Sequence, residues 1–166
     1  MFKAWPKIVR VENRRTPIFT EKIDGTNACV IVTESGELFC QSRTRLITPE
    51  DDNFGFAGWA YENKDFLVGA LGEGYHFGEW WGRGIQRTYG LQERRFSLFN
   101  TRRWGEHNPP PEGLHVVPVL PVTTPEEARE YLRTNGSVAA PGWSRPEGAI
   151  MLDLDTDTRF KIIIDK

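Results

Sequence analysis

Short apolar runs separated by turn residues recur along the sequence and predict a chain rich in β-strands. Residues 28–33 and 38–42 are two β-rich runs that flank the polar turn 34–37, and this order is typical of a β-hairpin. Several other runs are too apolar to have one face in solvent, which indicates strands buried on both sides. These further strands are predicted at 75–81, 96–100, 115–120, 149–154 and 159–164.

Helical periodicity appears between residues 56 and 71, where the apolar positions approximate one face of a helix. Asp52 or Asn53 is available to cap its beginning, and Gly72 follows its end. We therefore predict one helix over residues 56–71.

A second helix is predicted over residues 125–133. Thr124 is its cap, Pro125 lies in its first turn, Glu127 completes a capping box, and Gly136 follows its end. Many strands combined with two helices predict an α+β fold.

The composition fits one domain. A length of 166 residues and a mass of 19.0 kDa predict a single domain over residues 1–166. A hydrophobic fraction of 39% and a charged fraction of 27% exclude disordered and membrane-embedded classes. No apolar run approaches the roughly 20 residues that cross a bilayer, and the first residues lack the apolar segment of a signal peptide. We expect a cytoplasmic protein with no membrane partner.

The charge distribution bears on nucleic-acid binding. A formal net charge of -2 argues against a protein that coats nucleic acid by bulk charge. The arginines are concentrated, however, since six of them lie between Arg83 and Arg103, where Glu93 is the only acidic residue. Because guanidinium groups match phosphates geometrically, local contact with nucleic acid stays compatible with the acidic average.

Several common catalytic motifs are absent from the sequence. It contains no GxxxxGK phosphate loop, no GxGxxG fingerprint, no GxSxG elbow and no HExxH zinc motif. The three histidines are scattered, and Cys29 and Cys40 have neither CxxC spacing nor the number of a disulfide framework, which predicts buried, reduced thiols. Any catalysis is therefore expected to use Lys, Asp, Glu and Arg.

The most informative segment is 21–27, which places Lys22 in a dense polar cluster immediately before an apolar strand. A charged turn leading into the hairpin explains these residues as well as a functional site does. In favour of a site, Gly25 permits a close backbone approach, and more polar side chains converge here than a turn requires.

The segment Lys22-Ile23-Asp24-Gly25-Thr26-Asn27 resembles motif I, KxDGxN, of the covalent nucleotidyltransferases, which include ATP-dependent ligases and mRNA capping enzymes. Further segments resemble the other motifs of this superfamily in the same order, and together they span nearly the whole chain. They are Ser42-Arg43-Thr44 for motif Ia, Phe77-Gly78-Glu79 for motif III, residues 96–100 for motif IIIa, residues 147–150 for motif IV and residues 159–161 for motif V.

Asn27 selects a branch, because RNA ligases carry Asn at this position of motif I where DNA ligases and capping enzymes usually carry Arg. The opening Trp5-Pro6-Lys7-Ile8 is likewise similar to RNA ligases of the phage T4 RNA ligase 2 type. The resemblance implies twisted antiparallel sheets around a nucleotide cleft. Because motif V falls near the end of the sequence, we expect a catalytic core without the C-terminal accessory domain of the relatives, whose surface a protein partner would then supply.

The resemblance assigns a role to each matching residue. Lys22 would attack the α-phosphate of ATP and form a lysyl-AMP intermediate, with Mg²⁺ or Mn²⁺ held by Glu147 through water. Core packing or a paired strand carboxylate is the competing explanation for Phe99 and Glu79. The residues expected to bind the nucleotide are Glu21, Ile23, Asn27, Arg43, Glu79, Phe99, Glu147, Arg159 and Lys161.

Motif V departs most from the family pattern KxK. The sequence offers either Arg159-Phe160-Lys161, which keeps two cations, or Lys161-Ile162-Ile163, which loses one. Alternation along a strand places Arg159 and Lys161 on one face and permits the first alignment.

Aromatic, glycine and arginine residues alternate over residues 80–89, as in a loop that grasps a nucleic-acid strand. Arg83 and Arg87 would contact phosphates while Trp81 or Tyr89 stacks on a base. An aromatic core strand with a basic turn explains the segment equally well.

The sequence therefore predicts an ATP-dependent RNA ligase, or its adenylyltransferase core, which joins 5′-phosphate and 3′-hydroxyl ends of RNA or seals a nicked duplex. Two alternatives stay open. One is a DNA-strand ligase or an adenylyltransferase arrested before sealing, and the other is a non-catalytic RNA-binding protein of the same fold.

Overall fold

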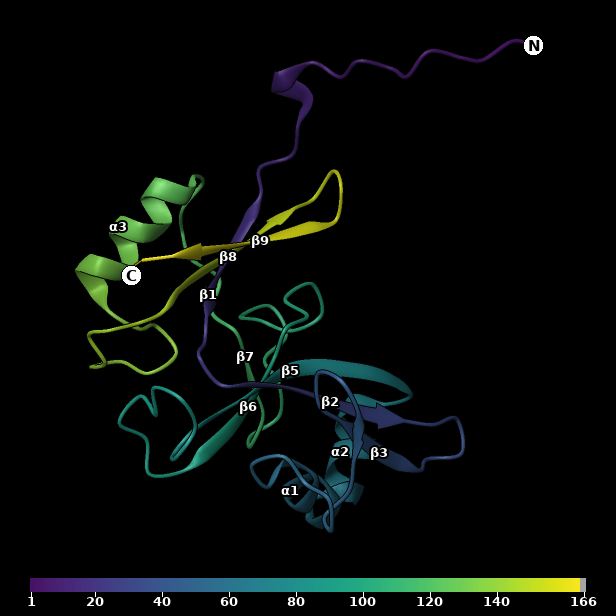
Figure 1. The fold of residues 1–166 in the computed structure, drawn as a ribbon, viewed down its shortest axis with the longest axis vertical. Helices are drawn as coiled ribbons and strands as arrows, with labels where there is room; N and C mark the ends of the chain where they lie inside the picture. The colour runs from purple at the N-terminus through teal and green to yellow at the C-terminus, as the bar shows by residue number, and fades with distance from the viewer. Residues whose placement is uncertain (165–166) are drawn as a thin grey trace.

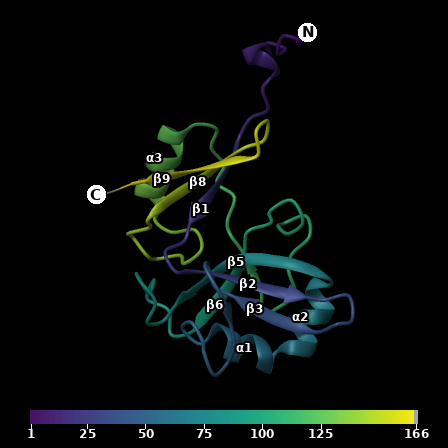
Figure 2. The same cartoon turned by 45° about the vertical axis from the view of Figure 1, so that its right-hand side comes forward.

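Two β-sheets, joined by the short connection 23–25, form the framework of the computed structural model, which describes residues 1–164 (Figures 1 and 2). The smaller sheet has the order β1-β8-β9 and is antiparallel throughout. The larger sheet has the order β4-β3-β2-β5-β6-β7, and its strands are antiparallel except for the parallel pair β6 and β7.

The strands are β1 (Ile18–Lys22), β2 (Thr26–Val32), β3 (Leu38–Gln41), β4 (Leu46–Ile47), β5 (Gly74–Gly82), β6 (Arg94–Leu98), β7 (His115–Val116), β8 (Gly148–Asp153) and β9 (Thr158–Ile163). The helices are α1 (Phe56–Glu62), α2 (Lys64–Leu71), α3 (Pro125–Asn135) and the 3₁₀-helix η1 (Val11–Asn13). The predicted α+β class is confirmed. The structure also contains two strands, β1 and β4, that the sequence did not predict.

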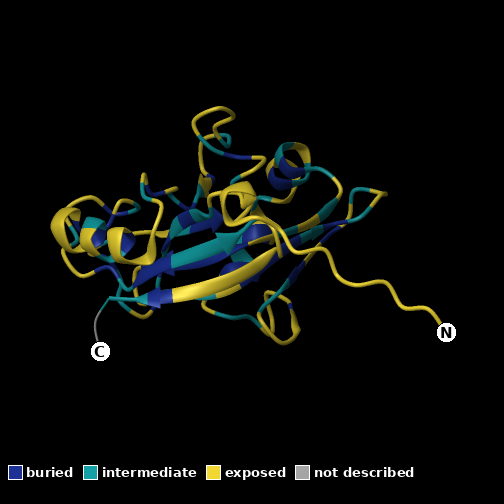
Figure 3. Cartoon of the chain, turned by 90° about the horizontal axis from the view of Figure 1, so that it is seen from above, coloured by how far each residue is buried: buried dark blue, intermediate teal, exposed yellow. Residues whose placement is uncertain are grey.

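Helices cover the outer face of each sheet and leave the inner faces for a site (Figure 1). On the smaller sheet, Ala128 and Leu132 of α3 pack against Phe19, Ala149 and Ile162. On the larger sheet, α1 and α2 bury their apolar side chains against β2, β3, β5 and β6. Figure 3 shows the same division, with buried residues between helix and sheet and exposed residues on the outer side of α3. Burial of this apolar surface is the main driving force for the two-layer arrangement.

The predicted helix over residues 56–71 is divided in two at Asn63. The side-chain amide of Asn63 donates to the carbonyl of Trp59 at 2.8 Å and competes with the regular helical pattern. Asp52 does cap the beginning, since its carboxylate accepts hydrogen bonds from the amides of Ala57 and Gly58 at 2.8 and 2.9 Å. The prediction was therefore correct for the location of the helical segment and wrong for its continuity.

The predicted strand 115–120 is also shorter than expected. Only His115–Val116 pair with β6, after which the chain crosses to the free edge of β1. There the amide of Glu21 donates to the carbonyl of Pro118 at 3.0 Å, and Leu120 donates to Phe19 at 2.8 Å. Because Pro118 has no N–H group, it cannot contribute a donor to a continuous ladder. This crossing ties the two sheets together a second time.

The N-terminal ten residues extend away from the sheets and helices (Figure 3), and Trp5 is 92% exposed. Within residues 1–164, no helix combines the length and the apolar character needed to cross a membrane. Cys29 and Cys40 are free and buried, as predicted.

Candidate active site

Lys22 is the last residue of β1 and lies at the junction of the two sheets. Its Nζ donates a hydrogen bond to Oε2 of Glu147 at 2.9 Å, and the two side chains are 27% and 18% exposed. The register of β1 and β8 brings the pair together, because Lys22 stands opposite Gly148, the residue after Glu147. Motif I and motif IV therefore meet in space although they are far apart in the sequence.

Glu79 approaches the same junction from the larger sheet. It lies in β5 opposite Asn27 of β2, and its Oε2 accepts a hydrogen bond from the Gly25 amide at 2.9 Å. Burial raises the pKa of Glu79 to about 7, although the Gly25 hydrogen bond and the charge of Lys22 oppose this rise. An added Cβ at Gly25 would stand 2.6 Å from Cβ of Trp81, so only glycine permits this approach of the chain.

Asp24 holds the connection between the sheets in place. Its carboxylate pairs with Nε of Arg87 at 3.1 Å, and its amide donates to the hydroxyl of Tyr89 at 2.8 Å. Burial raises the pKa of Asp24, the negative charge of Glu147 adds to the rise, and the charge of Arg87 opposes it. The sequence predicted that Arg87 contacts phosphates. In the structure Arg87 instead pairs with Asp24 and donates a hydrogen bond to the carbonyl of Arg145 at 2.9 Å.

A cavity of about 250 Å³ lies between the inner faces of the two sheets. This volume is close to the lower end of the range of small-molecule sites, about 300 to 1,000 Å³. Lys22 lines it together with six residues that the sequence predicted to bind the nucleotide, which are Glu21, Ile23, Asn27, Glu79, Phe99 and Arg159. The other lining residues were not predicted from the sequence, and they are Ile18, Thr20, Thr101, Val117, Ile150 and Leu152. Alternation along 148–153 was the available signal for Ile150 and Leu152, since it places both on one face of β8.

The residue Glu21 lines the cavity, but its carboxylate is not available to a ligand, so the predicted contact with the nucleotide stays a prediction for its other atoms. It is 1% exposed and accepts hydrogen bonds from the Ser137 hydroxyl at 2.7 Å and from the amides of Val138 and Ala139 at 2.7 and 2.9 Å. Burial raises its pKa, and these three hydrogen bonds limit the rise. Glu21 thus anchors the loop after α3 to the strand that presents Lys22.

The two cations of motif V lie on one face of β9. Arg159 stands opposite Leu152, Lys161 stands opposite Ile150, and both partners line the cavity. Lys161 is exposed and is not part of the lining itself. Ile163 shares this face, so both alignments of motif V stay open, although Arg159 is the one of the two cations that lines the cavity among the described residues.

Arg43 lies in the exposed turn between β3 and β4 and, among the described residues, is not part of the cavity lining. It is the one predicted nucleotide contact of the larger sheet that the structure does not bring to the cavity.

Trp81 is a core residue, and the prediction that it stacks on a base is wrong. Its side chain is 1% exposed, its Nε1 donates to the hydroxyl of Ser97 at 2.9 Å, and its ring meets Tyr89 edge-on at 5.0 Å. The alternative interpretation, an aromatic core strand followed by a basic turn, is the correct one. Arg83 in that turn is exposed.

The site fits a divalent metal held mainly by water and phosphate oxygens. Within residues 1–164, no group of three or more His, Cys, Asp and Glu side chains could enclose a metal ion. Asp24 and Glu147 nevertheless lie near enough to influence each other electrostatically. Mg²⁺ usually binds through one or two carboxylates together with waters and substrate phosphates, and this donor set suits that mode.

Comparisons with known proteins agree with this geometry. The chain is similar in fold to solved structures of Naegleria gruberi RNA ligase. A mutant with ATP and Mn gives a TM-score of 0.63 at 19% identity and covers 92% of this chain and 50% of that one. The structure with PPi gives a TM-score of 0.62 at 20% identity, with 92% and 50% coverage. A mutant with AMP and Mn gives 0.60 at 19% identity, with 92% and 51% coverage.

This chain thus spans about half the length of those ligase chains. No curated protein matches it. The family model described as RNA ligase matches residues 15–163, and the chain therefore belongs to the RNA ligase family.

Proposed function

We propose that this chain is the nucleotidyltransferase core of an ATP-dependent RNA ligase, with Lys22 as the nucleophile. The observation that supports the proposal is the convergence of distant residues around one lysine. Glu147 contacts Nζ of Lys22, and Glu79, Asn27 and Phe99 line the same cavity. The fold shared with RNA ligase structures that contain ATP or AMP adds support.

In the first step, Nζ of Lys22 attacks the α-phosphorus of ATP. A P–N bond forms, the bond to the β-phosphate oxygen breaks, and pyrophosphate leaves. The amine is reactive only when it is neutral, yet its reference pKa is about 10.4. Glu147 forms an ion pair with Nζ at 2.9 Å, and this contact must open before Nζ can attack.

A divalent metal, when bound, would neutralise phosphate charge and favour the neutral amine. Glu147 is the carboxylate that would hold the water shell of the metal, because its contact with Lys22 opens when the nucleotide binds. The cations Arg159 and Lys161 would stabilise the charge that develops on the phosphates. Arg43 stays a predicted contact to the ribose and phosphate region.

The nucleoside is assigned to the part of the cavity that Phe99 and Glu79 line. Phe99 presents a ring that is 40% exposed, and a purine could stack on it. Glu79 is assigned to the ribose hydroxyls, because a carboxyl with a pKa of about 7 both donates and accepts hydrogen bonds near neutral pH. Asn27, opposite Glu79, is assigned to the phosphate side.

The later steps transfer AMP to a 5′-phosphate and then displace it by a 3′-hydroxyl. We assign RNA as the strand, because Asn27 stands where RNA ligases carry Asn. The specific similarity to the phage T4 RNA ligase 2 type stays a prediction, as does a protein partner that supplies a further domain.

The test is covalent labelling with α-³²P-ATP and Mg²⁺ or Mn²⁺. Wild type and Lys64→Ala, which changes an exposed lysine of α2, should acquire the label, whereas Lys22→Ala should not. Intact mass should increase by one AMP in the first two proteins only. Absence of lysine-dependent label would refute the proposal and favour a non-catalytic protein.

Substrates with 5′-phosphorylated nicks in RNA and in DNA then separate the remaining alternatives. Sealing of the RNA nick is expected. Accumulation of adenylylated RNA without sealing would identify an arrested enzyme, and preferential sealing of DNA would identify a DNA-strand ligase.

A further inference from the structure

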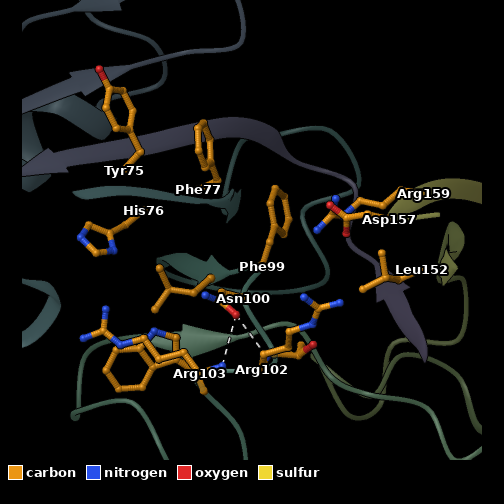
Figure 4. Close-up of a pocket in the computed structure, with 13 residues that line it drawn as sticks. Tyr75, His76, Phe77, Phe99, Asn100, Arg102, Arg103, Leu152, Asp157 and Arg159 are labelled. Atoms are coloured by element: carbon orange, nitrogen blue, oxygen red, sulfur yellow. Dashed lines mark hydrogen bonds between the residues drawn. The ribbon is translucent and has the colours of Figure 1, made fainter. Parts of the chain in front are cut away.

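A second cavity, of about 780 Å³, opens beside the nucleotide cavity (Figure 4). The two cavities are continuous in their lining, because Phe99, Thr101, Leu152 and Arg159 belong to both. The proposed nucleotide chemistry uses only the smaller one. A ligand in the larger cavity would therefore lie directly next to a nucleotide bound at Lys22.

Aromatic rings form one wall of this second cavity. Tyr75 and Phe77 occupy alternate positions of β5 and are 62% and 52% exposed, and Phe99 follows β6. The amide of Phe99 donates to the carbonyl of Phe77 at 3.0 Å, which fixes the two backbones side by side. In Figure 4 the three rings lie in a row that leads toward Arg159. We call Tyr75, Phe77 and Phe99 the aromatic row.

The aromatic row is not explained by core packing. The apolar core of the larger sheet lies on its opposite face, where α1 and α2 cover it. The rings of Tyr75 and Phe77 are nearly parallel, with an interplanar angle of 19° and centroids 6.2 Å apart. This separation is close to twice the spacing of about 3.4 Å per nucleotide along a stacked strand. Flat, exposed rings at this interval suit stacking with bases.

Positive charge lies on the other side of the cavity. Arg102 and Arg159 are exposed, whereas Arg103 is held by the carbonyl of Leu71 at 2.9 Å. Among residues 1–164, Asp157 is the one carboxylate in the lining. Arginines therefore outnumber acidic groups here, although the chain as a whole has a net charge of -2.

We propose that Tyr75 and Phe77 of the aromatic row, with Arg102, bind the unpaired nucleic-acid strand whose end reacts at Lys22, and that Phe99 and Arg159, which line both cavities, lie where this strand meets the nucleotide. Exposed aromatic side chains on a sheet that stack bases, combined with cations that contact phosphates, are the usual means of binding single strands. Because the two cavities are continuous, a strand bound in the larger cavity would lead toward the nucleotide at Lys22. The identification of the strand as RNA rests on the proposed function.

The experiment measures binding of a fluorescein-labelled, 5′-phosphorylated 12-nucleotide RNA by anisotropy. The variant is Tyr75→Ala combined with Phe77→Ala. Its matched control is Tyr61→Ala, which removes an exposed aromatic ring from α1, on the other face of the larger sheet. A further variant, Phe77→Trp, keeps a ring for stacking.

The double variant should bind the single strand at least about 25-fold more weakly, because each stacked base contributes about 1 kcal/mol or more. Tyr61→Ala and Phe77→Trp should bind within about twofold of wild type. Wild-type affinity should fall steeply as salt is raised. A double variant that binds as tightly as wild type would refute the aromatic row as an RNA site, and this is also the result expected if the face packs against a protein.

AMP labelling of Lys22 in the same preparations separates this inference from the proposed function. A labelled double variant with weak RNA binding supports both. A labelled double variant with unchanged RNA binding refutes only the aromatic row. An unlabelled wild type whose RNA binding depends on Tyr75 and Phe77 refutes only the enzymatic proposal.

Discussion

Replacement of Glu79 by Gln tests whether this carboxyl is as strongly perturbed as its position between the sheets indicates. In the wild type, the Gly25 amide donates a hydrogen bond to Oε2 of Glu79 at 2.9 Å. Gln keeps a side-chain oxygen that can accept this hydrogen bond, but its side chain does not titrate. Burial raises the pKa of Glu79 from 4.5 to about 7. One pKa unit corresponds to about 1.4 kcal/mol, so this difference is worth about 3 kcal/mol.

The direction of the effect follows from proton linkage. The folded protein binds the Glu79 proton more tightly than the unfolded chain does. The stability linked to that proton is therefore fully present below pH 4.5 and is lost as the pH rises through about 7. Glu79→Gln removes this loss. Relative to wild type, the variant should gain about 3 kcal/mol of unfolding free energy between pH 4.5 and pH 8.

Urea unfolding at pH 4.5, 6, 7 and 8, without nucleotide, measures the difference between the two proteins. In thermal unfolding, the same change corresponds to about 6–12 °C in the difference between their Tm values. Other buried groups such as Glu21 titrate in both proteins and cancel in the comparison. Glu34→Gln, in the exposed turn 34–37, is the control and should follow wild type. If the difference in unfolding free energy between wild type and Glu79→Gln is constant from pH 4.5 to pH 8, the raised pKa of Glu79 is refuted.

Three other predictions concern packing, thiol reactivity and capping. Gly25→Ala should lower the unfolding free energy by about 1–3 kcal/mol, because its Cβ would stand 2.6 Å from Cβ of Trp81; unchanged urea unfolding would contradict this. Burial raises the pKa of Cys29 to about 11 and that of Cys40 to about 12, so a disulfide reagent at pH 8 should label neither thiol until urea unfolds the protein. Thr124→Ala should cost about 1 kcal/mol because its hydroxyl caps α3 at 3.2 Å, whereas Thr124→Ser should be nearly neutral in the same unfolding assay.

The helix α3 was predictable because its signals are local. The Thr124 cap, Pro125 in the first turn and Gly136 after the end all lie within the segment that they define. In the structure the helix extends to Asn135, two residues beyond the predicted end. Such signals act through neighbouring backbone groups and need no tertiary information.

The strand β1 was not predictable in the same way. Its last two residues are Glu21 and Lys22, whose charges suggest a turn. The carboxylate of Glu21 is buried only because the loop that begins at Ser137 supplies its hydrogen bonds, and Lys22 is paired with Glu147. Both partners lie more than 100 residues away along the chain, so no local pattern indicates them.

Aromatic residues show the same limit. Trp81 and Phe77 both belong to the strand-forming run at 75–81, yet Trp81 is buried and Phe77 is 52% exposed. Alternation places both on the same face of β5, and Trp81 is buried because Ile23, Tyr89 and Val117 pack against its end of the strand, which no local pattern indicates. The motif order placed Lys22, Glu79 and Phe99 around one cavity without deciding these orientations.

The connection 23–25 has a consequence for how the site can be assembled. Lys22 ends a strand of the smaller sheet, and Asn27 and Glu79 belong to the larger one, so the two walls of the cavity come from different sheets that are joined beside the nucleophile. A change in the angle between the sheets would move the lysine relative to the ribose and base contacts while leaving each sheet intact. A nucleotide that contacts both walls would act as a crosslink between them and fix the angle at which Lys22 faces the phosphates.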